Sequence, residues 1–293
     1  MRAVVSALSV SPARVWDFLE LTKPRITTLV LVTAAVGYAV GAGRGLDPAS
    51  FVALLVGTAL VAGGASALNQ YSERDADARM DRTRQRPLPS GRVTPREALT
   101  FGLAVSTAGL VPLAMVNALT AALGAAALAS YVLLYTPLKR VTSLCTVVGA
   151  VPGAIPPMMG WAAARGSLDA GAWALFAVLF LWQLPHFLAI GWIYREDYAR
   201  GGFPMLPVID RDGNATGRQM VLYSAALVPI TLVAGALASA GPGYLWSALA
   251  LGLVFFASSA RFALTRSLAA ARLLFLVSVL YLPVLLGLMV FDR

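Results

Sequence analysis

The stretch LLFLVSVLYLPVLLGLMVF, residues 273–291, contains no charged side chain and is long enough to decide the fold class. An α-helix rises about 1.5 Å per residue, so about 20 apolar residues cross a hydrocarbon layer of about 30 Å. The stretch is therefore predicted to span a membrane as a helix.

Eight further apolar stretches approach this length. They cover residues 26–43, 51–68, 99–116, 119–135, 143–163, 172–193, 220–238 and 244–260. Only Asn117 and Ala118 separate the third stretch from the fourth, so one long helix is an alternative there. We expect an all-α fold, a multi-pass transmembrane helical bundle of about nine spanning helices, with residues 1–293 as a single domain.

The composition supports this expectation and excludes several classes of protein. Of the 293 residues, 58% are hydrophobic and only 13% are charged. A water-soluble globular enzyme does not have this balance of residues. The single cysteine, Cys145, excludes an internal disulfide, and the single histidine, His186, excludes a histidine-rich metal site.

The basic residues predict the orientation of the bundle, because cytoplasmic loops are rich in Lys and Arg. With the N-terminus in the cytoplasm, all of the 23 Lys and Arg residues except Arg44, Arg165 and Arg293 fall on the cytoplasmic side. An odd number of spans then places the C-terminus outside. Residues 1–25 are expected to form a cytoplasmic or interfacial segment that includes a short helix.

The first long polar loop, NQYSERDADARMDRTRQRPLPSGRV, covers residues 69–93. Asn69, Glu73, Asp77 and Asp81 are spaced four apart, which predicts that they share one helix face. Their oxygens suit Mg²⁺, which takes one or two carboxylates together with substrate phosphates. Four arginines in the same loop are suited to diphosphate oxygens: Arg74, Arg82, Arg84 and Arg86. The alternative is an ordinary charged interfacial loop.

The second long polar loop, WIYREDYARGGFPMLPVIDRDGNATGRQ, covers residues 192–219. It follows the first loop by four spans, so both loops are expected on the same face of the membrane and in one site. Its polar cluster contains Tyr194, Arg195, Glu196, Asp197 and Tyr198. Beyond Gly202, a solvated loop is the alternative.

Together these residues resemble the UbiA-type intramembrane prenyltransferases, which carry an N-x-x-x-D-x-x-x-D motif and a second Asp-rich motif in two cytoplasmic loops. Asn69, Glu73 and Asp77 match the first motif, with glutamate in place of its first aspartate. Tyrosines 194 and 198 replace the outer aspartates of the second. Further strings are most similar to the haem-directed branch of the superfamily: LTKPRI at 21–26, YTPLKR at 135–140, GAVPGAIPPMMGW at 149–161, WQLPHF at 182–187 and YREDYARGGFPMLPV at 194–208.

The resemblance implies an enzyme that transfers the farnesyl group of farnesyl diphosphate to a vinyl group of haem b. Water adds in the same reaction, and the products are haem O and diphosphate. It implies Mg²⁺ as cofactor, haem b as substrate, and a location in the cytoplasmic (inner) membrane with the site facing the cytoplasm. Its partners would be the lipid bilayer and a downstream haem-modifying enzyme or terminal oxidase, and no nucleic acid.

The resemblance also suggests a role for each polar residue. Asn69, Glu73, Asp77 and Asp197 are expected to hold the metal, and Asp81 to join them as a catalytic residue. The residues expected to bind the diphosphate are Arg82, Arg86, Lys139 and Arg195, with Tyr194, Glu196 and Tyr198 also contacting substrate. Lys23, Arg25 and Arg140 are available for the haem propionates. His186 is expected to ligate haem iron or orient the porphyrin, with a hydrogen bond between helices as its alternative.

Two other functions remain open at this point. One is a UbiA-type enzyme with another aromatic or tetrapyrrole acceptor. The other is a transporter or a non-catalytic assembly factor for a respiratory oxidase, because Gly- and Pro-containing helices also mark transporter sites. The acids gather at one predicted membrane face rather than at the midplane, which favours diphosphate chemistry.

Overall fold

The computed structural model describes residues 12–43 and 45–292, so three of the basic residues on which the predicted orientation depends lie outside it: Arg2, Arg44 and Arg293. Within this described part, nine helices are long and apolar enough to cross a membrane, which confirms the predicted number of spans. The spanning helices are α2 (Pro24–Ala42), α3 (Pro48–Asp77), α4 (Pro95–Val116), α5 (Ala118–Ala129) with its continuation to Leu138, α7 (Cys145–Arg165), α8 (Ala170–Ile193), α11 (Asn214–Leu237), α12 (Pro242–Thr265) and α13 (Leu268–Phe291).

The shorter helices lie between these spans or at their ends. Helix α5 continues through a π-helical segment, Ser130–Tyr135, into α6 (Thr136–Leu138). Helix α1 (Pro12–Leu21) precedes the first span, as expected for the N-terminal segment. Helices α9 (Arg195–Gly201) and α10 (Leu206–Ile209) lie in the second long polar loop.

Asn117 separates the third span from the fourth and excludes the single long helix. Its backbone is extended, with φ −170°. The Asn117 side chain accepts a hydrogen bond from the Thr120 amide at 2.8 Å and donates one to the Ala162 carbonyl of α7 at 2.9 Å. One side chain therefore caps α5 and fixes the turn against a neighbouring helix.

Glycine allows several spans to pack with their backbones in contact. A Cβ added to Gly160 of α7 would lie 2.0 Å from the Ala34 carbonyl oxygen of α2, and one added to Gly37 would lie 2.0 Å from the Pro157 carbonyl oxygen. Close approach through small residues provides the van der Waals contact that holds membrane helices together, because burial from water contributes little there.

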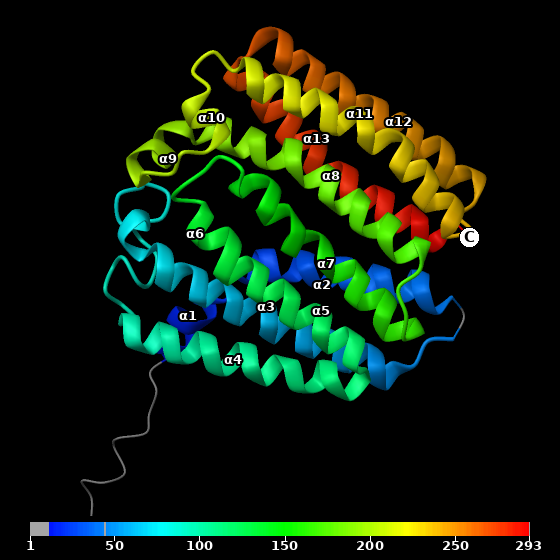
Figure 1. The fold of residues 1–293 in the computed structure, drawn as a ribbon, viewed down its shortest axis with the longest axis horizontal. Helices are drawn as coiled ribbons and strands as arrows, with labels where there is room; N and C mark the ends of the chain where they lie inside the picture. The colour runs from blue at the N-terminus through cyan, green and yellow to red at the C-terminus, as the bar shows by residue number, and fades with distance from the viewer. Residues whose placement is uncertain (1–11, 44, 293) are drawn as a thin grey trace, which may run out of the picture.

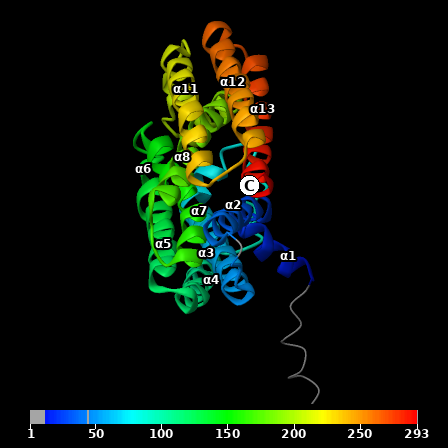
Figure 2. The ribbon, with the colours of Figure 1, turned by 90° about the vertical axis from the view of Figure 1, so that its right-hand side faces the viewer.

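The two polar loops lie at the same end of the bundle, as predicted. Helices α11, α12 and α13 form one side of the bundle and α3, α4 and α5 the other, with α2, α7 and α8 between them (Figures 1 and 2). The segment 78–94 that follows α3 lies beside α9 (Figure 1). We call this end of the bundle the loop end; the C-terminal end of α13 lies at the opposite end.

Candidate active site

Three oxygen-bearing side chains lie at the end of α3 and are buried. Asn69, Glu73 and Asp77 are exposed by 3%, 2% and 1%. The Asn69 amide donates to Glu73 Oε1 at 2.9 Å. Helical spacing brings these residues to one face as the sequence predicted, and we call the three the acid–amide cluster.

Cations from three distant parts of the chain surround the acid–amide cluster. Lys139 Nζ donates to Glu73 Oε2 at 2.8 Å, and Arg86 Nη1 donates to Asp77 Oδ2 at 2.8 Å. Lys23 Nζ donates to Asn69 Oδ1 at 3.0 Å. The charges of the two buried acids are thereby balanced by an ammonium and a guanidinium, as buried charges require.

The two lysines outside the spans respond differently to this environment. Burial disfavours the charged form of Lys139, but the charge and hydrogen bond of Glu73, together with the neighbouring Tyr198, hold the pKa of Lys139 above its usual value. Burial, together with the neighbouring charge of Arg86, lowers the pKa of Lys23 to about 7.

Asp81 does not share the helix face of the acid–amide cluster, so that expectation is wrong. Helix α3 ends at Asp77, and the chain turns there because segment 78–94 makes contacts with α9. The Asp81 amide donates to Asp197 Oδ1 at 3.1 Å, and Arg79 donates to the Gly201 carbonyl at 3.0 Å. These contacts between the two loops override the continuation of the helix.

Asp81 and Asp197 form a second anionic group with Arg200. Arg200 Nη2 donates to Asp81 Oδ2 at 2.8 Å and also pairs with Asp197 Oδ1. Asp197 is buried, whereas the Asp81 side chain is 66% exposed. Asp81 of the first polar loop therefore contacts Asp197 and Arg200 of the second, and the two loops meet as predicted.

Arg82 is held by aromatic side chains. Its guanidinium lies 5.2 Å from the ring centre of Tyr194 and 5.5 Å from that of Tyr198, and it donates to the Tyr198 hydroxyl at 3.2 Å. This is the only hydrogen bond of the Arg82 side chain among the described residues. The two tyrosines therefore fix a guanidinium while leaving most of its donors for an anion.

The acid–amide cluster fits a magnesium site that substrate completes. Asp77 Oδ1 is buried and accepts no hydrogen bond in the described part of the chain, so one carboxylate oxygen lacks a partner. Within that part, no group of three or more His, Cys, Asp and Glu side chains is assembled that could hold a metal ion without other ligands. Two carboxylates and an amide oxygen suit Mg²⁺ when phosphates supply further ligands.

Other predicted site residues lie outside these contacts. Arg140 donates to the Ser72 carbonyl, and Arg195 stacks on Trp192 at 4.8 Å. Glu196 is exposed. His186 Nδ1 lies 2.7 Å from Ser278 Oγ of α13, which is the interhelical hydrogen bond weighed as its alternative.

The structure brings three further residues to the site, for which the sequence predicts no role. Thr136 accepts from the Asn69 amide at 3.1 Å, and the Phe203 ring lies 4.4 Å from Lys139 Nζ. Gln70 is buried and donates to the Leu21 carbonyl at 2.9 Å. Thr136 lies in the YTPLKR string, Gln70 in the first polar loop and Phe203 after the Gly201–Gly202 turn of the second, so all three lie within the quoted stretches.

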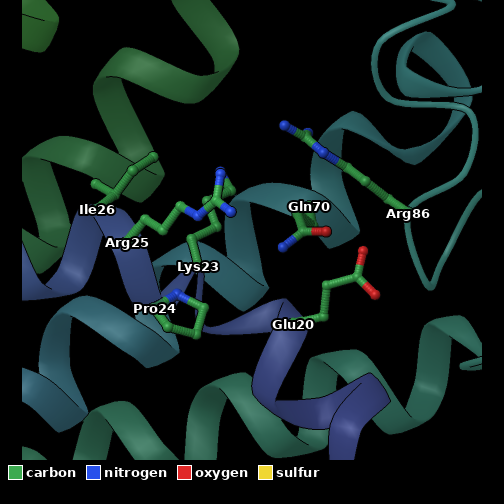
Figure 3. A pocket seen from close by; sticks show the side chains of 7 residues that line it. All are labelled: Glu20, Lys23, Pro24, Arg25, Ile26, Gln70 and Arg86. Atoms are coloured by element: carbon green, nitrogen blue, oxygen red, sulfur yellow. The ribbon is translucent and has the colours of Figure 1, made fainter.

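An open pocket of about 640 Å³ lies beside the acid–amide cluster. Figure 3 shows Lys23 and Arg25 on one side of it, at the start of α2, and Arg86 reaching in from segment 78–94 on the other. The remaining lining residues are Glu20, Pro24, Ile26 and Gln70. Because Lys23 and Arg86 also contact the cluster, the pocket and the cluster share a wall.

Comparison of the sequence with known proteins shows the family of the chain. Residues 30–281 match the UbiA prenyltransferase family. The chain is 50% identical over 287 residues to "Protoheme IX farnesyltransferase" of Solibacter usitatus, covering 94% of this chain and 98% of that one.

Solved structures show the same fold at low sequence identity. The chain is similar to digeranylgeranylglyceryl phosphate synthase with a TM-score of 0.81 and 15% identity, over 96% of this chain and 98% of that one. It is also similar to a UbiA homologue from Archaeoglobus fulgidus bound to DMAPP and Mg²⁺, with a TM-score of 0.70 and 16% identity, over 94% and 99% of the two chains.

Proposed function

The chain belongs to the UbiA prenyltransferase family, and from this premise we propose that it farnesylates haem b. Farnesyl diphosphate is the donor, a vinyl group of haem b is the acceptor, and water adds to give haem O. This is the activity named for the relative that is 50% identical over nearly the whole of both chains. The protein is a multi-pass membrane enzyme, and its loop end faces the cytoplasm.

The unpartnered Asp77 Oδ1, among buried acids and cations, is the observation that carries the proposal. Asn69, Glu73 and Asp77 would hold Mg²⁺, and a structural relative is described as bound to Mg²⁺ with a prenyl diphosphate. Bound Mg²⁺ neutralises negative charge that develops on the departing diphosphate. Asp197 and Asp81 adjust the site through Arg200 and the contact between the loops.

Cationic side chains bind the diphosphate oxygens directly. Arg82, fixed by Tyr194 and Tyr198, presents free N–H donors, and Lys139 and Arg86 bring charge to the edge of the acid–amide cluster. Donors held in place before the reaction stabilise charge at the leaving group without reorganising. The electron-rich vinyl group is itself the nucleophile, so no nucleophilic side chain is required.

The proposal is tested with purified protein in lipid nanodiscs supplied with haem b, farnesyl diphosphate and Mg²⁺. Mass spectrometry of the extracted haem is expected to show a product heavier by one farnesyl group and one water, absent when EDTA is added. Unchanged haem together with released diphosphate would show that the acceptor is wrong. Folded protein that changes neither substrate would reject the activity.

A further inference from the structure

The pocket beside the acid–amide cluster has a wall of cations but no free acid among its lining residues. Lys23, Arg25 and Arg86 supply the positive charge. Glu20 is the one carboxylate of the lining, and Arg92 Nη2 pairs with it at 2.9 Å. A divalent cation therefore finds no unpaired carboxylate here, whereas an anion meets the guanidinium groups of Arg25 and Arg86 beside the Lys23 amine.

Among the three cations of the pocket wall, Arg25 differs because its side chain makes no ion pair or hydrogen bond with the described residues. Lys23 is bound to Asn69, and Arg86 is bound to Asp77. For Arg25, which is exposed, the described residues offer no acid within ion-pair distance and no hydrogen-bond acceptor. An unpaired guanidinium at a pocket wall presents its planar donors to a carboxylate in bidentate geometry.

The unusual backbone conformation of Lys23 indicates that surrounding contacts fix the shape of the pocket. Lys23 has φ 50°, in the left-handed region that a lysine seldom adopts, between the end of α1 and Pro24. Such strain persists only where surrounding contacts determine it. Here it places Lys23 and Arg25 together at the pocket, with Lys23 Nζ at Asn69.

The pocket also has an apolar border. Pro24 and Ile26 line it, and Ile26 is 56% exposed on α2. The site therefore suits a molecule with an apolar body and carboxylates along one edge. Of the two substrates of the proposed reaction, only haem b has this character, because its propionates lie on one edge of an apolar ring.

We propose that this pocket binds the propionate carboxylates of the acceptor, with Arg25 as their specific partner, while the acid–amide cluster is left to the diphosphate. The inference rests on the proposed function and assigns a separate place to each anionic group of its two substrates. Anchoring the propionates leaves the vinyl groups, which lie elsewhere on the ring, free to face the donor. Arg140, bound to the Ser72 carbonyl, is not part of this anchor.

The test compares haem b with its dimethyl ester, in which both propionates are blocked, in wild type and in Arg25→Gln. Binding is measured by absorbance titration in nanodiscs of neutral lipid, independently of turnover. Loss of a hydrogen bond between charged groups predicts about tenfold weaker binding of haem b by Arg25→Gln, and wild type should bind the ester about tenfold more weakly than haem b. Arg25→Gln should no longer distinguish haem b from the ester.

A matched control is Arg218→Gln, which removes another exposed arginine from α11, a helix that contributes no residue to the pocket lining (Figure 1). It should bind haem b as wild type does. Farnesyl thiodiphosphate should bind equally well to all three proteins; weaker binding to Arg25→Gln alone would assign the pocket to the diphosphate and overturn the inference.

Three further outcomes separate the inference from its premise. If wild type farnesylates haem b but binds the ester as tightly, the propionate anchor is wrong and the enzyme activity stands. If anionic lipid in the nanodisc displaces haem b from wild type but not from Arg25→Gln, and the ester still binds like haem b, the pocket takes a lipid headgroup instead. If haem b does not bind to folded wild-type protein, the proposed function itself fails.

Discussion

Asp77→Asn removes one charge from the centre of the acid–amide cluster and keeps the shape of the side chain. Asp77 is 1% exposed, its Oδ2 holds Arg86 at 2.8 Å, and its Oδ1 accepts no hydrogen bond among the described residues. Two effects follow from these contacts: loss of the oxygen offered to Mg²⁺, and an Arg86 guanidinium left without its carboxylate.

The loss of stability and the loss of turnover are expected to differ in size, and each is measured by its own assay. Breaking a fully buried ion pair costs about 3–5 kcal/mol, but the Arg86 side chain is 25% exposed, so we expect about 2 kcal/mol and a lower midpoint of thermal unfolding. Loss of one fixed electrostatic group from an active site lowers turnover by about 100- to 1,000-fold. Turnover should therefore fall far more than stability.

The assay follows haem O formation by mass spectrometry over a titration of Mg²⁺. The matched control is Asp75→Asn, the same substitution two residues away on α3, where the side chain is 72% exposed and lies 3.7 Å from Arg74. The control should keep wild-type turnover and the same Mg²⁺ midpoint. A folded Asp77→Asn protein with the turnover and Mg²⁺ midpoint of wild type would refute the assignment of Asp77 to the metal.

Three further predictions concern other parts of the structure. Lys139→Gln leaves the buried Glu73 carboxylate without its cation and should destabilise the fold by about 3 kcal/mol; adding Glu73→Gln should restore the melting temperature but not turnover. His186→Ala should weaken haem binding in an absorbance titration, and an unchanged haem spectrum with unchanged product would leave His186 with a packing role only. Gly160→Ala should destabilise by about 1–3 kcal/mol because its Cβ meets backbone, whereas Gly287→Ala, with nothing within 4 Å, should be neutral or stabilising; equal melting temperatures would contradict the close packing of α2 on α7.

The number of spans and the first part of the site followed from the sequence alone. Apolar length is a local property, so each stretch of about 20 residues predicts its own helix without knowledge of its neighbours. Spacing of four residues is also local, and it correctly placed Asn69, Glu73 and Asp77 on one face of α3. The two polar loops were assigned to one end of the bundle by the alternation of spans.

The tertiary structure decided what each of these side chains contacts. The Asp81 prediction failed because α3 ends where segment 78–94 meets α9, a contact between residues 116 positions apart. The pairing of Lys139 with Glu73, and of Lys23 with Asn69, likewise joins α3 to segments distant along the chain. Helix periodicity specifies a face, but the partner of that face depends on how the spans pack, which is a property of the whole bundle.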